Sequence, residues 1–283
     1  MAPSLLAIAG LDPTGGAGLV LDIRVFNSRG WMGLGIATAV TSQNTQKVFD
    51  VFCMSRKALR RQYEAIREDI PIAGIKIGMM GCAKNLEVLG RILEDNPGIP
   101  VVADTVFRAG SGYWLFESAA LDEFVRTIKG RVSLITPNIP EASLLLKKSI
   151  DTAAKMRDAA EILCHRTGAP CLLKGGHLPG QKVDILFDGN TFQSFPHPSI
   201  QKKVHGTGCF LSSNLLCFLA AGYPLGKTVK ASIDLTLEAI RNAVPAGKGQ
   251  NLIDWTRSPS GPTRRRRSRA AEVGLDPGSD SER

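Results

Sequence analysis

The sequence lacks the signatures of several protein classes. No uncharged apolar run approaches the roughly 20 residues that a membrane-spanning helix needs, so we expect no membrane partner. The six cysteines stand without CxxC spacing, which argues against a zinc site or a disulfide scaffold and fits a reducing, cytoplasmic compartment. The first residues have no basic segment before their apolar stretch, so they predict a first strand and not a signal peptide.

The composition is that of a folded domain followed by a tail. The chain has 283 residues, of which 43% are hydrophobic and 22% charged. This excludes wholesale disorder and allows a substantial core. Residues 256–283 are rich in Ser, Pro, Gly and Arg, so we expect a disordered basic tail behind one folded domain, residues 1–255. The arginine run 264–267 could touch nucleic acid, but a short basic run is a poor predictor, and we expect a solvated extension instead.

Apolar runs that end at turn residues alternate with segments of helical spacing. Extended segments are predicted over residues 5–10, 33–40, 48–54, 72–78, 99–104, 132–136 and 171–174, with a hairpin at 183–187 and 191–195. Helices are predicted over residues 19–29, 55–69, 83–95, 121–128, 140–146, 152–166, 208–221 and 224–243. This alternation predicts a mostly parallel sheet covered on both faces. Ligands on such sheets bind beyond the carboxyl ends of the strands, so the residues after each strand are the candidates for a functional site.

Three segments that follow strands could each be structural or functional. The glycine-rich loop 10–18 opens a helix, whose free N–H groups favour anions, but it matches neither GxGxxG nor GxxxxGK[ST] and could be an ordinary tight turn. Asn138 and Glu141 could orient a hydrated Mg²⁺ beside phosphate or could cap a helix. Lys174, at the end of a buried strand, could meet an anion or extend to solvent. We expect no catalytic role for His165, His177 and His197.

The segment 205–213, HGTGCFLSS, is the most informative one. Gly206, Thr207 and Gly208 precede a strongly apolar helix, so their successive backbone N–H groups are expected to form an anion hole. Cys209 would lie in the first turn of that helix. The helix dipole and any nearby cation would lower the pKa of its thiol and make it a candidate proton acceptor, whereas a bound phosphoryl group would oppose that shift. The alternative is a buried apolar cysteine.

The order of these motifs resembles a known family. The motifs are GGAG (15–18), TSQNT (41–45), KIGMMG (76–81), VVAD (101–104), TPNIPEA (136–142), LLKGGH (172–177), VDILFDG (183–189) and HGTGC (205–209). Together they resemble the hydroxymethylpyrimidine/phosphomethylpyrimidine kinase family, a branch of the ribokinase-like superfamily, over roughly residues 5–245. The resemblance implies a three-layer α/β/α sandwich with a mostly parallel central sheet and a small β lid near residues 33–54.

The resemblance also implies an activity and a cofactor. The γ-phosphoryl group of ATP would be transferred to a pyrimidine alcohol, 4-amino-5-hydroxymethyl-2-methylpyrimidine, and to its monophosphate in thiamine biosynthesis. Mg²⁺ would assist the transfer, and the enzyme would be a homodimer.

The resemblance further assigns a role to each candidate site residue. The pyrimidine would lie against Gly10, Asp12, Gln43 and Met79. Asp104 and Glu141 would lie near Mg²⁺, and the ATP phosphates would lie near Asn138, Lys174 and Thr207. Gly206, Thr207 and Gly208 would form the anion hole, and Cys209 would be the base.

Departures from the family pattern keep other functions open. The family usually has a lysine where this chain has Gly110, and Arg108, two residues earlier, could supply the cation. A second hypothesis is a pyridoxal or pyridoxine kinase on the same scaffold. A third is a non-catalytic ligand sensor whose basic tail binds nucleic acid.

Overall fold

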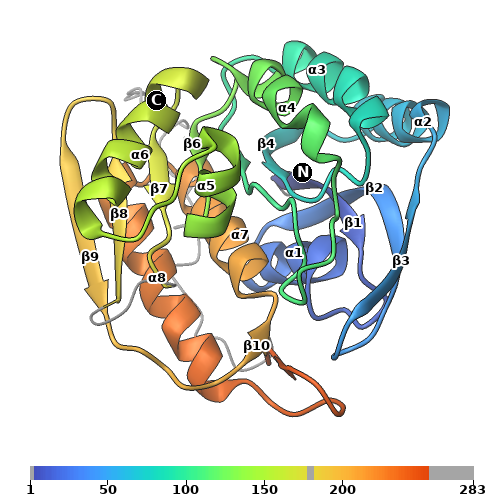
Figure 1. Cartoon of the computed structure of the whole chain (residues 1–283). Helices are drawn as coiled ribbons and strands as arrows, with labels where there is room; N and C mark the ends of the chain where they lie inside the picture. Colours follow the sequence, from blue (N-terminus) through green and yellow to red (C-terminus); the bar gives the residue numbers. More distant parts are fainter. Residues whose placement is uncertain (1–2, 177–181, 255–283) are drawn as a thin grey trace, which may run out of the picture.

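A nine-stranded sheet forms the middle of the molecule (Figure 1). The computed structural model describes residues 3–176 and 182–254, so the predicted tail 256–283, its arginine run and His177 lie outside the described residues. The strand order is β3-β2-β1-β4-β5-β6-β7-β8-β9. All pairs from β2 to β7 are parallel, whereas β3 at one edge and the β8–β9 hairpin at the other are antiparallel. The predicted mostly parallel sheet is confirmed.

The elements follow the predicted alternation closely. The strands of the sheet are β1 (Ser4–Leu11), β2 (Met32–Gln43), β3 (Val48–Cys53), β4 (Ile72–Ile77), β5 (Val101–Ala103), β6 (Leu134–Ile135), β7 (Cys171–Leu173), β8 (Lys182–Phe187) and β9 (Phe192–His197). The helices are α1 (Gly18–Ser28), α2 (Arg56–Arg67), α3 (Leu86–Asp95), α4 (Leu121–Ile128), α5 (Ile139–Leu146), α6 (Ala153–Thr167), α7 (Thr207–Ala220) and α8 (Leu225–Asn242), with short 3₁₀ turns at Ala83–Asn85 and Ser118–Ala120.

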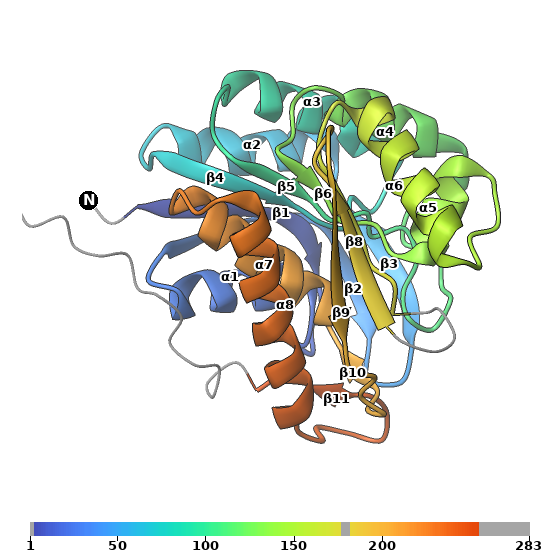
Figure 2. The same cartoon turned by 90° about the vertical axis from the view of Figure 1, so that its left-hand side faces the viewer.

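Helices cover both faces of the sheet, as an α/β/α sandwich requires. Figure 2 shows α2, α3, α4 and α6 on one side of the strands and α1, α7 and α8 on the other. The side chains of β1 serve both cores because successive residues of a strand point to opposite faces. Leu6 and Ile8 join the core beneath the first group of helices, and Leu5 and Ala7 join the core beneath the second.

The expected lid is a continuation of the central sheet. The first half of β2 pairs with β1, and its last residues, from Ala39 to Gln43, pair with β3. The β2–β3 hairpin therefore extends past the end of β1 as part of the same sheet, with register shifts between Ala9 and Leu11 of β1 and between Ser42 and Gln43 of β2. The pairing fixes the hairpin relative to the sheet, and this places Gln43 beside the residues that follow β1.

Two features of the fold were not predicted. Val204–His205 (β10) and Asn251–Leu252 (β11) form a separate parallel pair, and strands of two residues carry no periodic signal. A disulfide bond joins Cys53 of β3 to Cys82, which follows β4. The expectation drawn from cysteine spacing missed this bond because the two residues are 29 positions apart and meet only when β3 folds back. No helix in the two described ranges is long and apolar enough to span a membrane.

Candidate active site

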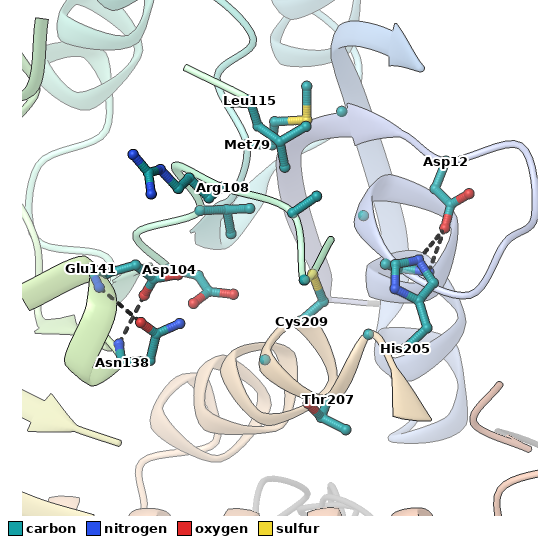
Figure 3. Close-up of a pocket in the computed structure, with 18 of the residues that line it drawn as sticks. Asp12, Met79, Asp104, Arg108, Leu115, Asn138, Glu141, His205, Thr207 and Cys209 are labelled. Atoms are coloured by element: carbon teal, nitrogen blue, oxygen red, sulfur yellow. Dashed lines mark hydrogen bonds and ion pairs between the residues drawn. The ribbon is translucent and has the colours of Figure 1, made fainter. Parts of the chain in front are cut away.

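One cavity of about 780 Å³ collects all of the predicted site residues. It opens where β1, β4, β5, β6 and β7 end, the position expected for ligands on a parallel sheet. Figure 3 shows Cys209 in the middle, with Asp12 and His205 to one side of it and Asp104, Asn138 and Glu141 to the other. The predicted residues in its lining are Gly10, Asp12, Gln43, Met79, Asp104, Asn138, Glu141, Lys174, Gly206, Thr207, Gly208 and Cys209.

Asp12 organises the glycine-rich loop. Its carboxylate accepts hydrogen bonds from the backbone N–H groups of Thr14 and Ala17 at 2.9 and 3.1 Å. Burial alone would raise the pKa of Asp12, but hydrogen bonds from His205 and Thr14 hold it below its usual value. Gly18 has a φ of +57°, and a Cβ there would collide with the Gly10 carbonyl oxygen. The loop is therefore both a tight strand–helix turn and a wall of the cavity.

His205 joins the two sides of the predicted pyrimidine region, and no role was predicted for it. Its Nε2 lies 2.8 Å from Asp12 Oδ2 and 3.1 Å from Gln43 Nε2. The Thr41 hydroxyl donates to Gln43 Oε1 at 3.1 Å. The Gln43 amide is thus held at the cavity wall, where it can donate and accept toward a ligand. His205 reaches this position as part of β10 (Val204–His205). In the sequence, its role was indicated only by its position directly before the GTGC motif.

The N-terminus of α7 lines the cavity next to Lys174. Gly206 caps the helix with a φ of +81°, and a Cβ there would collide with the Gly16 carbonyl oxygen. A Cβ on Gly208 would lie 3.6 Å from Lys174 Nζ. The first N–H groups of a helix have no partner within it. Together with Lys174, they provide the donors and the positive charge that a phosphoryl group requires.

Lys174 and Asp104 form a buried ion pair at the end of the sheet. Lys174 Nζ lies 3.1 Å from Asp104 Oδ1, and the side chains are 15% and 2% exposed. Asp104 also accepts hydrogen bonds from Thr136 and Ser212 at 3.2 and 3.1 Å. Burial opposes ionisation, but Lys174 and Lys76 keep the pKa of Asp104 below its usual value. Lys174 therefore stays inside the cavity as an ammonium group and does not extend to solvent.

A second buried pair, Lys76 and Asp22, was not predicted. Lys76 Nζ lies 2.8 Å from Asp22 Oδ2, and both side chains are fully buried. Burial alone would lower the pKa of Lys76, but Asp22, Cys209 and Asp104 raise it above its usual value. Lys76 lines the cavity and contributes a fixed positive charge there. A lone charge inside the apolar run 72–77 was the signal that could have identified it.

The expected acidification of Cys209 is wrong. Burial of the thiol, with added repulsion from Asp22 and Asp104, raises its pKa to about 11, and Lys76 opposes this only in part. Cys209 does lie in the first turn of α7. The helix dipole and the cation were expected to dominate, but the loss of solvation and the two carboxylates outweigh them. Cys209 is therefore a neutral thiol in the free protein.

Asn138 and Glu141 form the helix cap that the sequence left as one of two alternatives. The Glu141 N–H donates to Asn138 Oδ1, and the Asn138 N–H donates to Glu141 Oε2, both at 2.8 Å. The Thr105 hydroxyl donates to the same Oε2 at 2.9 Å. Both residues also line the cavity, so the cap and the ligand-facing role coexist. Burial raises the pKa of Glu141 to about 7, although Lys174 opposes the shift.

A magnesium ion in this cavity would be carried mainly by nucleotide. Within the described residues, no group of three or more His, Cys, Asp or Glu side chains could hold a metal by itself. Mg²⁺ usually binds one or two protein carboxylates together with substrate phosphates and water. The hydrogen bonds to Glu141 end on Oε2, which leaves Oε1 as the oxygen for such a role.

The loop after β5 lines one side of the cavity. Arg108 stacks on the Trp114 ring with its guanidinium carbon 3.7 Å from the ring centroid. Arg108 and Gly110 both line the cavity, and Figure 3 shows Arg108 above Asp104. The structure therefore places Arg108 on the wall where the family lysine is missing. Its stacking on an aromatic face leaves its N–H groups able to bind an anion.

A second pocket, of about 230 Å³, adjoins the anion-binding end of the cavity. It shares Asn138, Lys174, Thr207 and Gly208 with the main cavity. Apolar side chains of α7 and α8 form one wall, and Asp184 and His197 lie on the other. The apolar wall consists of Leu211, Ile233, Leu237 and Ile240.

A family model and a curated relative both match most of the chain. The family model described as phosphomethylpyrimidine kinase matches residues 12–254. The hydroxymethylpyrimidine/phosphomethylpyrimidine kinase of Aquifex aeolicus is 38% identical over 256 residues, which cover 88% of this chain and 99% of the relative.

Solved structures share the fold. The crystal structure of phosphomethylpyrimidine kinase from Clostridium difficile has a TM-score of 0.74 and 34% identity, covering 84% of this chain and 99% of that chain. Pyridoxal kinase from Staphylococcus aureus in complex with ADP has a TM-score of 0.83, covering 90% and 94% of the two chains. Its identity of 23% shows likeness of fold alone.

Proposed function

This chain belongs to the phosphomethylpyrimidine kinase family and is a kinase, and on this premise we propose which groups it phosphorylates and how. The substrates are 4-amino-5-hydroxymethyl-2-methylpyrimidine and its monophosphate, and the products serve thiamine biosynthesis. One observation carries the proposal. A single cavity contains both the Gly10, Gln43 and Met79 wall and the N-terminus of α7 with Lys174.

The Gln43 side of the cavity suits an aminopyrimidine ring. A Cβ on Gly10 would lie 2.7 Å from the Met79 sulfur, so only glycine leaves room for Met79 and a ring to share this wall. The Met79 thioether packs well against an aromatic face. A glutamine amide donates and accepts at once and can therefore pair with an amino group and a neighbouring ring nitrogen.

Phosphoryl transfer relies mainly on the fixed positive charges and N–H groups. The substrate oxygen attacks the γ-phosphorus of ATP, the bond from that phosphorus to the bridging oxygen breaks, and ADP leaves. Lys174 and the N–H groups at 206–209 stabilise the charge on the transferring group.

Cys209 accepts the hydroxyl proton through its thiolate. With a pKa of about 11, the thiolate is only about one part in 10⁴ at pH 7. The thiolate of such a group has a high proton affinity, so the small fraction present is an effective acceptor for the hydroxyl proton in the transition state.

Asp104 and Glu141 would hold Mg²⁺ together with the nucleotide phosphates. When bound, the ion neutralises charge on the β- and γ-phosphates. The second pocket would receive the nucleoside of ATP, because it continues from the phosphate-binding residues Lys174 and Thr207 and has an apolar wall for a flat base.

Assembly and location are further parts of the proposal. Phe49 and Phe52 on the edge strand β3 are 48% and 60% exposed, and an apolar edge strand is suited to pairing with a second copy. We therefore infer a homodimer. We also propose a location in the cytoplasm, a reducing compartment in which the Cys53–Cys82 bond would be open to reduction. Light scattering of the purified protein, with Phe52→Glu as the variant expected to remain monomeric, tests the assembly.

Release of ADP, measured with three acceptors in parallel, tests the function. The acceptors are the hydroxymethylpyrimidine, its monophosphate and pyridoxal. We expect turnover on both pyrimidines. A preference for pyridoxal would select the alternative, a pyridoxal kinase, to which this chain is similar in fold. Absence of turnover on every acceptor would support the ligand-sensing alternative.

A further inference from the structure

Two titratable side chains that phosphoryl transfer does not use meet on the wall of the second pocket. His197 ends β9, and Asp184 lies on the neighbouring strand β8. Their Nε2 and Oδ1 atoms are 3.4 Å apart, and the side chains are only 13% and 8% exposed. Both residues line the pocket that also contains Lys174 and Thr207. A nearly buried carboxylate thus faces the space proposed for the nucleotide.

Asp184 also fixes the chain next to the phosphate-binding lysine. Its Oδ1 accepts a hydrogen bond from the Gly175 N–H at 2.8 Å. A Cβ on Gly175 would collide with the Val183 carbonyl oxygen, so this segment lies directly against β8. Asp184 therefore cannot turn away from the pocket without releasing the residue that follows Lys174. Its charge has to be balanced where it stands.

His197 is the group placed to balance that charge. Its hydrogen bond with Asp184 raises the pKa of the imidazole, against a smaller lowering by burial and by Lys182. The Pro198 carbonyl oxygen lies 3.4 Å from its other ring nitrogen. Lys174 on the β7 side is engaged by Asp104.

The other charges near His197 come from α8. A groove on the outer side of His197 is lined by its charged side chains, namely Lys230, Asp234, Glu238 and Arg241. Lys230 pairs with Asp234 within the helix. None of these α8 groups lines the second pocket, where the imidazole is the cation beside Asp184.

We propose that His197 is a nucleotide-positioning residue, which in its protonated form cancels the charge of Asp184 and so admits the anionic nucleotide beside Lys174. The inference rests on the proposed function only in placing ATP in the second pocket. When the imidazole loses its proton, the Asp184 carboxylate, which is only 8% exposed, is left uncompensated near the end of the pocket where Lys174 and Thr207 would bind the polyphosphate chain. Like charges in such a setting repel strongly. Nucleotide affinity should therefore fall as pH rises through the pKa of His197.

Binding of a non-hydrolysable ATP analogue, measured by calorimetry between pH 6 and pH 9, tests this. We expect the Kd of the wild-type protein to rise about three- to tenfold over this range. His197→Gln should bind the analogue weakly at both pH 6 and pH 9, so that its Kd no longer changes with pH. Asp184→Asn, whose amide oxygen can still accept from Gly175, should bind tightly throughout. The analogue itself titrates in the same way with every variant. Differences in pH dependence between the variants therefore report on the Asp184–His197 pair.

His165→Gln is the matched control. His165 lies on α6 and is 66% exposed, so this variant should retain the wild-type pH response. The double variant His197→Gln/Asp184→Asn should bind tightly and fold even if the single histidine variant does not. In kinase assays the effect should appear in the KM for ATP and leave the KM for the pyrimidine unchanged.

Two results would overturn the inference. One is a wild-type pH response in His197→Gln, and the other is binding by Asp184→Asn at pH 9 that is as weak as that of the wild type. Either result, obtained with an enzyme that phosphorylates the pyrimidines, leaves the proposed function intact and removes the role of His197. Failure to bind the analogue at any pH, or turnover on no acceptor, would instead count against the proposed function.

Discussion

Lys76 and Asp22 form an ion pair that is closed off from solvent, with Nζ 2.8 Å from Oδ2 and both side chains fully buried. The pair connects β4 to α1 at the base of the cavity, and Ser213 of α7 donates to the second oxygen of Asp22 at 2.8 Å. Three elements that carry site residues are thereby fixed to one another. Lys76 and Lys174 both line the cavity.

Removal of one partner of this pair should destabilise the protein severely. We expect Lys76→Met to lower the free energy of unfolding by about 3–5 kcal/mol, because the carboxylate is left buried without a counter-charge. Urea denaturation measures this. The double variant Lys76→Met/Asp22→Leu should recover most of the loss. If the single and double variants were equally unstable, the charge of the pair would not be the cause.

Replacement of Cys209 should slow the chemical step and change its pH dependence. We expect Cys209→Ala to reduce kcat by about 10²–10⁴-fold with a modest change in KM. For the wild type at saturating ATP, kcat/KM for the pyrimidine should rise with pH between 6 and 9, because the thiolate fraction increases about tenfold per pH unit below the pKa of about 11. The variant should lose this rise. An unchanged kcat in Cys209→Ala would make Cys209 a packing residue.

Gln43 should matter for the pyrimidine and not for the nucleotide. We expect Gln43→Ala to raise the KM for the hydroxymethylpyrimidine by about tenfold or more, since a ligand donor and acceptor would both lose their partner. The KM for ATP should stay within about twofold, because Gln43 does not line the second pocket. Gln46→Ala, in the turn that follows, is the matched control. Equal effects on both substrates would point to a general distortion of β2.

Loss of the Cys53–Cys82 bond should destabilise the hairpin side of the sheet. The bond closes a loop of 29 residues, and cross-links of this span contribute about 2–4 kcal/mol. Thermal unfolding with and without a reductant should therefore show a lower Tm for the reduced wild-type protein. Cys53→Ser/Cys82→Ser should match the reduced protein and should not respond to the reductant. A response that persists in the double variant would implicate another cysteine.

Much of the fold and most of the site could be predicted because the signals are local. The apolar run at the start of the chain predicts β1, Ser55 caps α2 by accepting from the Ala58 N–H, and Asp188 forms the turn of the β8–β9 hairpin through its hydrogen bonds to Asn190 and Thr191. Glycines at positions that need positive φ identify the loops around the cavity. All of these depend on neighbours within a few residues.

The features that were missed or reversed depend on distant partners. His205 gains a role only when β10 lies beside Asp12 and Gln43. The Asp184–His197 pair exists only because β8 and β9 pair in their observed register. The pKa of Cys209 was predicted in the wrong direction because a motif shows the helix dipole but does not show the burial and the two carboxylates that act against it.

The sequence alone determined the alternation of strands and helices, the glycine loops and the residue types of a kinase site. These follow from the chemistry of short segments, which is independent of the rest of the chain. The tertiary structure alone decided which charges are paired, which thiols are protonated and which strands meet. Solvation and charge depend on everything that surrounds a group in space, and only the packed chain brings those surroundings together.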